Sequence, residues 1–338
     1  MGNDVSRPIV TLALVLSSSV AGCNSSPRPQ TSSPKPDFAT KYDDITFSME
    51  STIAPGSEAQ VCRVVQMPLD RGDLAVPSAE SHFTKGSHHF LAYRTSLTSM
   101  PDGGSDLFDC FDANPSYIAG SYFESQQPDM THTLPDGIAQ VFKPGEIVLL
   151  QTHYLNTTSD PIDAKIRFTL HTMDPAKVEH EAGTILFSNF GVMIPPHSKV
   201  TQTDTCPVSS TADMNLLLLW SHMHSRAVHF VATTDDPGAS GAPLYETDQW
   251  SEPQPRAFDG DDATTVHIGS HITFACDYDN ATDSTFVYGP SAAKNEMCIL
   301  HGMYWPRVDP ITEFCIGGTG PFPPGVTIPT ADAGVDGG

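Results

Sequence analysis

The feature that most constrains the fold of this chain is an alternation of apolar and polar residues. In residues 165–171 the apolar side chains Ile166, Phe168 and Leu170 alternate with polar ones. Successive side chains of a β-strand point to opposite faces, so this pattern predicts a strand with one buried face. Similar strand-like runs cover residues 146–155, 215–233 (long enough for two strands) and 266–278.

Turn signals separate these runs, and no amphipathic helix of any length interrupts them. Pro135-Asp-Gly and Lys143-Pro-Gly are two examples, and Pro, Asp and Gly favour tight turns. Many short strands in a chain of this length predict an all-β fold of two consecutive antiparallel β-sandwich (jelly-roll) domains with an interdomain cleft. We expect the two domains to cover residues 41–178 and 179–316.

The two ends of the chain have compositions that do not predict a packed fold. Residues 1–22 contain Arg7, an apolar run and small residues before Cys23. This predicts a bacterial lipoprotein signal peptide, after which an acylated Cys23 is the new N-terminus; an ordinary signal peptide is the alternative. Residues 23–40 are a Ser/Pro-rich tether and residues 317–338 a flexible Gly/Pro tail. We therefore expect an exported protein, lipid-anchored to a bacterial membrane and facing the periplasm or the exterior.

The net charge argues against one class of partner, and the cysteine content predicts disulfides. The net charge of −23 repels phosphate backbones, so nucleic acid is not an expected partner. An even number of cysteines follows Cys23, and in an exported chain this predicts disulfides. The sequence alone does not choose among the possible pairings. The six residues are Cys62, Cys110, Cys206, Cys276, Cys298 and Cys315.

Fourteen histidines are many for a chain of this length, and two of them are separated by a single residue. His222 and His224 belong to a strand-like run. Alternate side chains of a strand share a face, so these two imidazoles can bind one ion together. Zinc and iron sites also use this spacing, and two histidines on a solvent-exposed face are an equally good interpretation of the pair alone.

Four further candidate ligands, two of them adjacent histidines, are weaker when each motif is taken alone. His88 and His89 are adjacent, so in a regular strand they would point to opposite faces. Gly86 just before them favours a bulge that would let both bind one ion. His153 lies in a strand-like run and Met297 precedes a cysteine. Without their neighbours, both are more typical of packing positions than of ligands.

The order of these motifs along the chain is more specific than any one of them. The chain has His-His, Leu-Gln-x-His-Tyr, His-x-His and Glu-Met-Cys, which end at His89, Tyr154, His224 and Cys298. This order resembles the copper type II ascorbate-dependent monooxygenases, such as peptidylglycine α-hydroxylating monooxygenase and dopamine β-monooxygenase. The likeness extends over residues 42–316.

The resemblance implies two separate copper ions. The electron-transfer copper would be held by three imidazoles, those of His88, His89 and His153. The oxygen-activating copper would be held by His222, His224 and Met297. Gln151 would contribute a hydrogen bond near the first copper. Imidazole suits copper in both oxidation states and a thioether favours Cu(I), so the two ligand sets agree with these roles.

The resemblance also implies a reaction and a set of disulfides. A monomeric catalytic unit would hydroxylate a C–H bond of a small organic substrate in the interdomain cleft, using O2 and a one-electron reductant such as ascorbate. The implied disulfides are Cys62–Cys110, Cys206–Cys315 and Cys276–Cys298.

The chain departs from the peptide-amidating members at two positions that recognise a substrate carboxylate. Those members have an Arg two residues before His-x-His and a Tyr four residues after the Met; this chain has Trp220 and His301. Neither offers the guanidinium fork that suits a carboxylate, so peptidylglycine is not the expected substrate. His301 either faces the cleft, as a substrate-binding or proton-handling residue, or packs there. The other histidines, including His132, we expect to be structural or exposed.

Two other functions remain open. One is a non-catalytic copper-binding or storage lipoprotein, which would bind copper without consuming oxygen. The other is a divalent-metal hydrolase that uses only His222 and His224 with a carboxylate such as Asp213 or Asp277. In the hydrolase Met297 would be dispensable.

Overall fold

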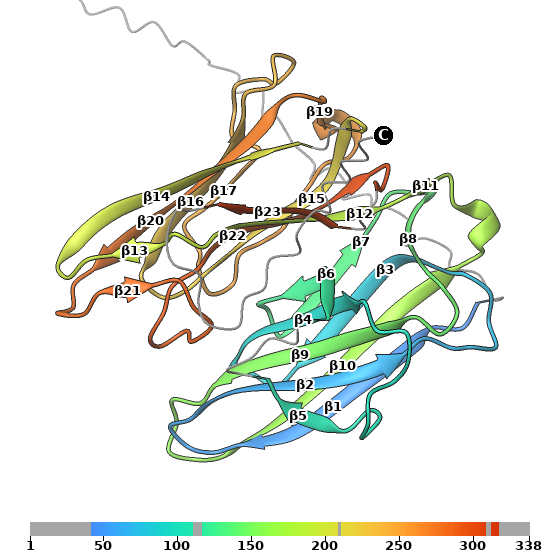
Figure 1. Cartoon of the computed structure of the whole chain (residues 1–338), viewed down its shortest axis with the longest axis horizontal. Helices are drawn as coiled ribbons and strands as arrows, with labels where there is room; N and C mark the ends of the chain where they lie inside the picture. Colours follow the sequence, from blue (N-terminus) through green and yellow to red (C-terminus); the bar gives the residue numbers. More distant parts are fainter. Residues whose placement is uncertain (1–41, 111–116, 209–210, 309–311, 318–338) are drawn as a thin grey trace, which may run out of the picture. The chain divides into compact units, whose positions relative to one another are not determined.

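The structure, a computed structural model, describes residues 42–110, 117–208, 211–308 and 312–317, all within one compact unit, Phe38–Gly338. Strands dominate these residues, and their only helical elements are two short 3₁₀ turns (Figure 1), so the predicted all-β class is confirmed. Among the same residues no helix has the length and apolar character needed to cross a membrane. The predicted signal peptide, Cys23, the whole tether and all of the tail except Gly317 lie outside the described residues.

The strands of the first half of the chain form two sheets, and their pairs are antiparallel except β11 with β8. One sheet has the order β1 (Ile45–Ile53), β10 (Ile162–Met173), β3 (Leu74–Phe83), β8 (Ile138–Phe142) and β11 (His180–Glu181), with β7 (Asp129–Thr133) also paired to β3. The other has the order β5 (Leu107–Asp109), β2 (Glu58–Gln66), β9 (Ile147–Leu155), β4 (Ser87–Thr95) and β6 (Ile118–Ser125).

The strands of the second half pair only with one another. The larger sheet has the order β18 (Arg256–Ala257), β15 (Met214–Met223), β22 (Cys298–Trp305), β12 (Gly183–Asn189) and β23 (Thr312–Gly317), with β19 (Thr265–Val266) also paired to β15. The second sheet has the order β14 (Ser198–Pro207), β20 (His271–Asn280), β16 (Ala227–Thr234) and β17 (Tyr245–Thr247). A two-stranded sheet joins β13 (Met193–Ile194) to β21 (Phe286–Val287).

Apolar side chains from both sheets of each half meet in a core, which gives a sandwich-like packing. In the first half Phe90 of β4 and Phe168 of β10 belong to different sheets, and their ring centroids lie 5.1 Å apart. In the second half Leu219 of β15 and Phe274 of β20 share one core cluster. Complete burial of a side chain of this size contributes about 1.5–3 kcal/mol. The alternating pattern in the sequence is therefore the pattern of these inward-facing positions.

The three expected disulfides are present and tie strands within each half. Cys62–Cys110 joins β2 to the end of β5. Cys206–Cys315 joins β14 to β23 and Cys276–Cys298 joins β20 to β22. These last two bonds connect the two main sheets of the second half.

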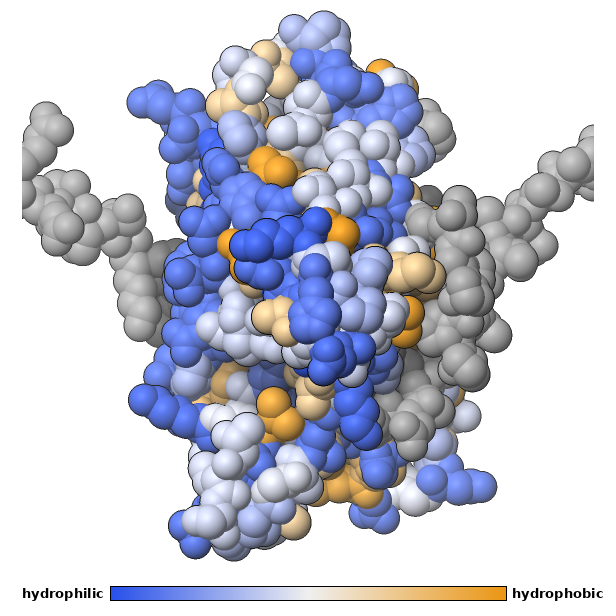
Figure 2. All heavy atoms as spheres, turned by 90° about the vertical axis from the view of Figure 1, so that its left-hand side faces the viewer, coloured by the Kyte–Doolittle hydropathy of each residue, from blue (hydrophilic) through white to orange (hydrophobic). Residues whose placement is uncertain are grey.

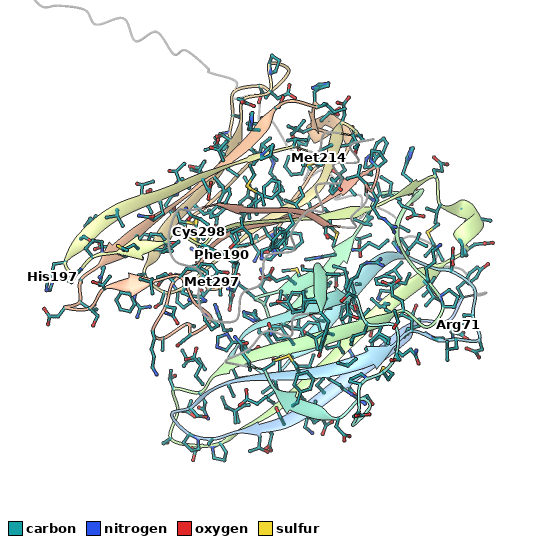
Figure 3. All side chains as sticks on the ribbon, in the orientation of Figure 1. Arg71, Phe190, His197, Met214, Met297 and Cys298 are labelled. Atoms are coloured by element: carbon teal, nitrogen blue, oxygen red, sulfur yellow. A yellow bond between two sulfur atoms is a disulfide. The ribbon has the colours of Figure 1, made fainter. Side chains whose placement is uncertain are left out.

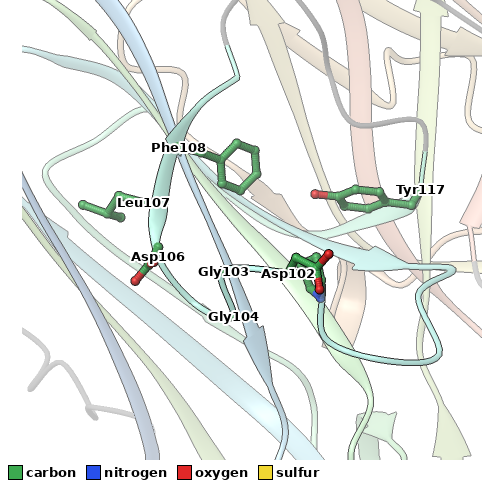
Figure 4. Close-up of a pocket in the computed structure, with 8 residues that line it drawn as sticks. Asp102, Gly103, Gly104, Asp106, Leu107, Phe108 and Tyr117 are labelled. Atoms are coloured by element: carbon green, nitrogen blue, oxygen red, sulfur yellow. The ribbon is translucent and has the colours of Figure 1, made fainter.

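The outer surface shows no single dominant apolar area on the face drawn in Figure 2, which is mostly hydrophilic with small groups of apolar residues. A shallow pocket of about 270 Å³ lies where Leu107, Phe108 and Tyr117 approach a Pro101–Gly104 turn (Figure 4). Its lining contains no histidine, cysteine or methionine. The candidate metal ligands lie elsewhere.

Candidate metal centre

A β-bulge orients the adjacent histidines of β4. The pairing of β4 with β9 shifts between Ser87 and His89, which leaves His88 as the extra residue, and Gly86, two residues before it, has a φ of 101°. A bulge re-aims one side chain of a strand. As a result the rings of His88 and His89 lie on the same side, with centroids 5.1 Å apart. The bulge predicted from Gly86 is confirmed.

Strand β9 brings His153 beside this pair. His89 and His153 are cross-strand partners, and their ring centroids lie 5.0 Å apart. His153 is completely buried and donates from Nε2 to Oε1 of Glu58 on β2, at 2.9 Å. Because Nε2 faces this carboxylate, Nδ1 is the ring nitrogen of His153 that would bind a metal ion.

Strand β15 supplies His222, and His224 follows immediately after its last residue. The Nδ1 atom of His224 donates to the carbonyl oxygen of Asn295 at 3.0 Å. The backbone N–H of His224 donates to the buried carboxylate of Glu296, which also accepts hydrogen bonds from Arg226. These contacts fix both the backbone and the ring of His224, and they direct its Nε2 away from Asn295.

The five histidines converge on one buried cluster. The ring centroid of His88 lies 5.0 Å from those of His222 and His224, and that of His89 lies 5.1 Å from that of His222. Two triads have ligand atoms within 4.8 Å of one another, and both contain His88. They are His88, His89 and His153, and His88, His222 and His224. The exposed fractions of all five residues are 8% or less.

The two expected ligand sets lie next to each other in this cluster. The first expected trio is brought together, and His222 and His224 lie against the same His88. The sequence motifs place ligands within each strand and carry no information on the distance between strands of different sheets. The assignment of these residues to two copper ions stays a prediction.

The cluster is suited to bind metal in its neutral form. Burial lowers the pKa of His88, His89 and His224 well below its ordinary value, and the neighbouring imidazoles lower it further. Neutral imidazole is the form that binds a metal ion. Several ring nitrogens are buried without a hydrogen-bond partner: Nε2 of His88, both nitrogens of His89, and Nε2 of His224. Buried polar atoms without a partner are costly, and metal ligation would satisfy these.

A carboxylate that the sequence interpretation missed lies next to the cluster. Glu124 of β6 is 2% exposed, and its Oε1 lies 3.1 Å from Nδ1 of His222. Its Oε2 lies 2.8 Å from Nε2 of His301 and accepts a hydrogen bond from Nε1 of Trp220 at 3.3 Å. Burial acts to raise the pKa of Glu124, but the two histidines outweigh it and hold the pKa well below its usual range. No local motif around Glu124 indicated this role.

His301 contacts Glu124 and also packs against an aromatic ring. His301 is buried and lies parallel to Trp220, with ring centroids 5.8 Å apart and an interplanar angle of 7°. The two residues are cross-strand partners on β22 and β15. His132, expected to be structural or exposed, is also buried against Trp220, with ring centroids 4.9 Å apart. Packing and contact with a carboxylate are therefore combined in His301.

Other expected site residues occupy the following places. Met297 directly precedes β22 (Figure 3), and its carbonyl oxygen accepts a hydrogen bond from Tyr278. Gln151 packs against the Cys62–Cys110 disulfide and accepts a hydrogen bond from Tyr93. The roles of Met297 as a ligand and of Gln151 near the first copper stay predictions.

The carboxylates considered for a hydrolase lie apart from the histidine pair. Asp213 accepts a hydrogen bond from the backbone of Ile268, and Asp277 accepts one from Thr201. Among the described residues, neither belongs to a metal-ligand group with His222 and His224.

Comparisons with known proteins support the resemblance seen in the sequence. Residues 180–319 match the model of a copper type II ascorbate-dependent monooxygenase, C-terminal domain. This range contains the His-x-His pair and Met297. The resemblance is thereby confirmed for this part of the chain. No curated protein matches the chain.

Solved structures are similar only at low identity. N-glycanase F (PNGase F) is 8% identical, with 80% of this chain and 97% of that chain covered and a TM-score of 0.35. The major capsid protein P2 from bacteriophage PM2 is 7% identical, with 78% and 99% covered and a TM-score of 0.29. At these TM-scores the likeness supports no statement about fold or function.

Proposed function

We propose that this chain is a copper-dependent monooxygenase. The premise is the match of residues 180–319 to the C-terminal domain of the copper type II ascorbate-dependent monooxygenases. It would hydroxylate a C–H bond of a small organic substrate with O2 and a one-electron reductant such as ascorbate. The observation that carries the proposal is the convergence of five buried histidines, of which His88, His89 and His224 have ring nitrogens without a hydrogen-bond partner. Two jelly-roll domains with a cleft for the substrate, divided near residue 178, are part of the same proposal.

The ligand sets follow from the positions of the ring nitrogens. His88, His89 and His153 would hold the electron-transfer copper, with His153 binding through Nδ1. His222, His224 and Met297 would hold the oxygen-activating copper, with His224 binding through Nε2. Bound copper supplies one-electron chemistry and activation of O2. The thioether of Met297 would favour the reduced ion, and Gln151 would add a hydrogen bond near the first copper.

The protein's own residues would orient the ligands and limit the choice of substrate. The carbonyl of Asn295 accepts a hydrogen bond from Nδ1 of His224, which fixes the nitrogen that His224 presents to the metal, and Glu124 places a carboxylate 3.1 Å from Nδ1 of His222. Trp220 and His301 are both engaged by Glu124. They are therefore not available to bind a substrate carboxylate, and we propose a substrate that is recognised without one.

Export, anchoring to a bacterial membrane through a lipid on Cys23, and a monomeric catalytic unit complete the proposal. The net charge of −23 agrees with an absence of nucleic-acid partners. Disulfides persist in the oxidising compartments that exported proteins occupy. The three disulfides of the structure agree with that environment.

The proposal is tested by oxygen uptake in the copper-loaded protein with ascorbate, across a panel of amines, aromatic compounds and amides. A substrate of the protein increases oxygen uptake and yields a hydroxylated product. Replacing Met297→Ile removes the thioether, and we expect product formation to fall by at least about a hundredfold, because even residues that only orient ligands contribute 10- to 100-fold. The variant retains copper at the three-histidine set.

A matched control is Met193→Ile, since Met193 is 54% exposed and lies on the short strand β13. This variant is expected to keep full activity. Unchanged product formation in Met297→Ile would show that Met297 is not a ligand. Stoichiometric copper binding without any substrate-dependent oxygen uptake would favour a copper-storage protein instead.

A further inference from the structure

We propose that Tyr278 is a positioning residue for Met297, the sulfur ligand of the proposed oxygen-activating copper. The hydroxyl of Tyr278 donates a hydrogen bond to the carbonyl oxygen of Met297 at 2.8 Å. The inference rests on the proposed function for the role of Met297 as a ligand. It adds the contact that would hold this residue in place beside His224.

The strand register places Met297 next to His224. Strands β15 and β22 are antiparallel, and their last pair is Met223 with Cys298. The same register, continued by one residue, sets Met297 opposite His224. Residues directly opposite each other in an antiparallel pair share a face of the sheet, so the thioether and the imidazole can approach one ion together. The hydrogen bond from the His224 ring to the carbonyl of Asn295 shows that this segment lies against His224.

Met297 lies just beyond this ladder, so the pairing of β15 with β22 does not by itself fix its backbone. The backbone N–H of His224 donates to the carboxylate of Glu296 rather than to Met297. The conformation of Met297 therefore depends on contacts from outside the sheet that contains His224.

Strand β20, which belongs to the other main sheet of the second half, supplies two such contacts. Cys276 and Tyr278 are alternate residues of β20, and both are buried on its inner face. Cys276 forms the disulfide with Cys298, and Tyr278 donates to the carbonyl of Met297. Two successive inward-facing side chains of β20 thus hold two successive residues of the ligand segment.

These two contacts restrict the direction of the Met297 side chain. The hydrogen bond fixes the carbonyl of Met297, and the disulfide fixes the residue that follows it. Tyr278 is 1% exposed, so water has little access to replace its hydroxyl as the donor. Residues that orient a metal ligand contribute about 10- to 100-fold to metal affinity or activity. We expect Tyr278, which acts through the backbone, to lie at the lower end of this range.

The test is Tyr278→Phe in the copper-loaded full chain. X-ray absorption of the ascorbate-reduced protein reports a copper–sulfur bond, since a thioether favours Cu(I). Competition with a coloured Cu(I) chelator reports the affinity. We expect the wild type to show the copper–sulfur bond. The variant should bind two coppers with a weakened or absent copper–sulfur signal, and the affinity of one Cu(I) should fall about tenfold.

The matched control is Tyr245→Phe. Tyr245 is also a buried tyrosine of the second half, and its hydroxyl donates to the backbone carbonyl of Gln254 at 3.1 Å. This variant loses a comparable buried hydrogen bond and should keep the copper–sulfur signal. Tyr278→4-aminophenylalanine keeps a donor at the same place and should also keep the signal. It covers the case that Tyr278→Phe does not fold.

The possible results separate the role of Tyr278 from that of Met297. A wild-type copper–sulfur signal that is unchanged in folded Tyr278→Phe would overturn the positioning role and leave Met297 as a ligand. The same conclusion would follow if Tyr245→Phe lost the signal equally, or if a folded 4-aminophenylalanine variant lost it. A reduced wild type with two coppers and no copper–sulfur bond would overturn the ligand role of Met297, and the positioning role with it.

Discussion

At the scale of single residues, the candidate site depends on what each imidazole does with its second nitrogen. His153 and His224 each donate one N–H to a fixed acceptor, Glu58 and Asn295 respectively. Each of these hydrogen bonds fixes the tautomer of its imidazole and directs the other ring nitrogen toward the cluster. His88 reaches the cluster for a different reason, since it is the extra residue of a bulge.

Asp236, a buried carboxylate in a loop of the second half, offers a residue-scale test of the fold. Asp236 accepts hydrogen bonds from the backbone N–H groups of His267 and Gly238 and from the His267 ring. The backbone hydrogen bond from His267 is the main cause that lowers the pKa of Asp236 to about 2. Hydrogen bonds to a charged group contribute about 1.5–3 kcal/mol, so Asp236→Asn should lower the free energy of unfolding by about 2 kcal/mol at pH 5.

The pH dependence of this difference has a defined sign. A carboxyl group whose pKa is lower in the folded state stabilises the fold above its unfolded pKa of 3.8. That contribution is lost as the pH falls from 3.8 toward 2. Urea unfolding at pH 5 and pH 2.5 should therefore show a smaller gap between wild type and Asp236→Asn at the lower pH. Asp261→Asn is an exposed control, and a gap that is independent of pH would contradict the argument.

At the scale of elements, the pairing of β15 with β22 positions both the His-x-His segment and His301. Gly302 lies opposite Leu219 in this ladder. A Cβ at Gly302 would lie 2.6 Å from Leu219 Cδ2 and 2.8 Å from the backbone oxygen of Leu218. The glycine is therefore required by the close approach of the two strands rather than by its φ angle.

Replacing Gly302→Ala should push β22 away from β15. We expect a loss of about 1–3 kcal/mol in the free energy of unfolding, the usual cost of overpacking, together with weaker copper binding at His222 and His224. Chemical denaturation and copper titration measure the two effects. Gly72→Ala is the matched control, because a Cβ at Gly72 meets no atom within 4 Å. Equal stability of the two variants would show that β22 tolerates the added methyl group.

The elements were predictable from the sequence where a local pattern specifies them. The run at 165–171 lies inside β10, and the run at 215–233 corresponds to β15 and β16. Gly86 correctly indicated the bulge of β4. The disulfides followed from the family resemblance rather than from the spacing of the cysteines.

At the scale of the whole molecule, the sequence did not indicate which residues from different sheets would meet. Glu58 and Glu124 belong to no motif in the sequence, so nothing local marked them as neighbours of His153 and His222. Nor did the motifs indicate the distance between the two expected ligand sets, and His88 lies in both triads of the structure. Contacts between distant strands depend on packing that a period-two pattern does not encode.

The most direct test of the central claim, that the buried histidines are a copper centre, is the metal content of the protein expressed with export and loaded with copper. We expect two copper atoms per chain in the wild type and one in His222→Ala/His224→Ala. His197→Ala, at an exposed position, should retain two. A protein that takes up zinc in preference to copper, or copper content that does not change in the double variant, would contradict the account.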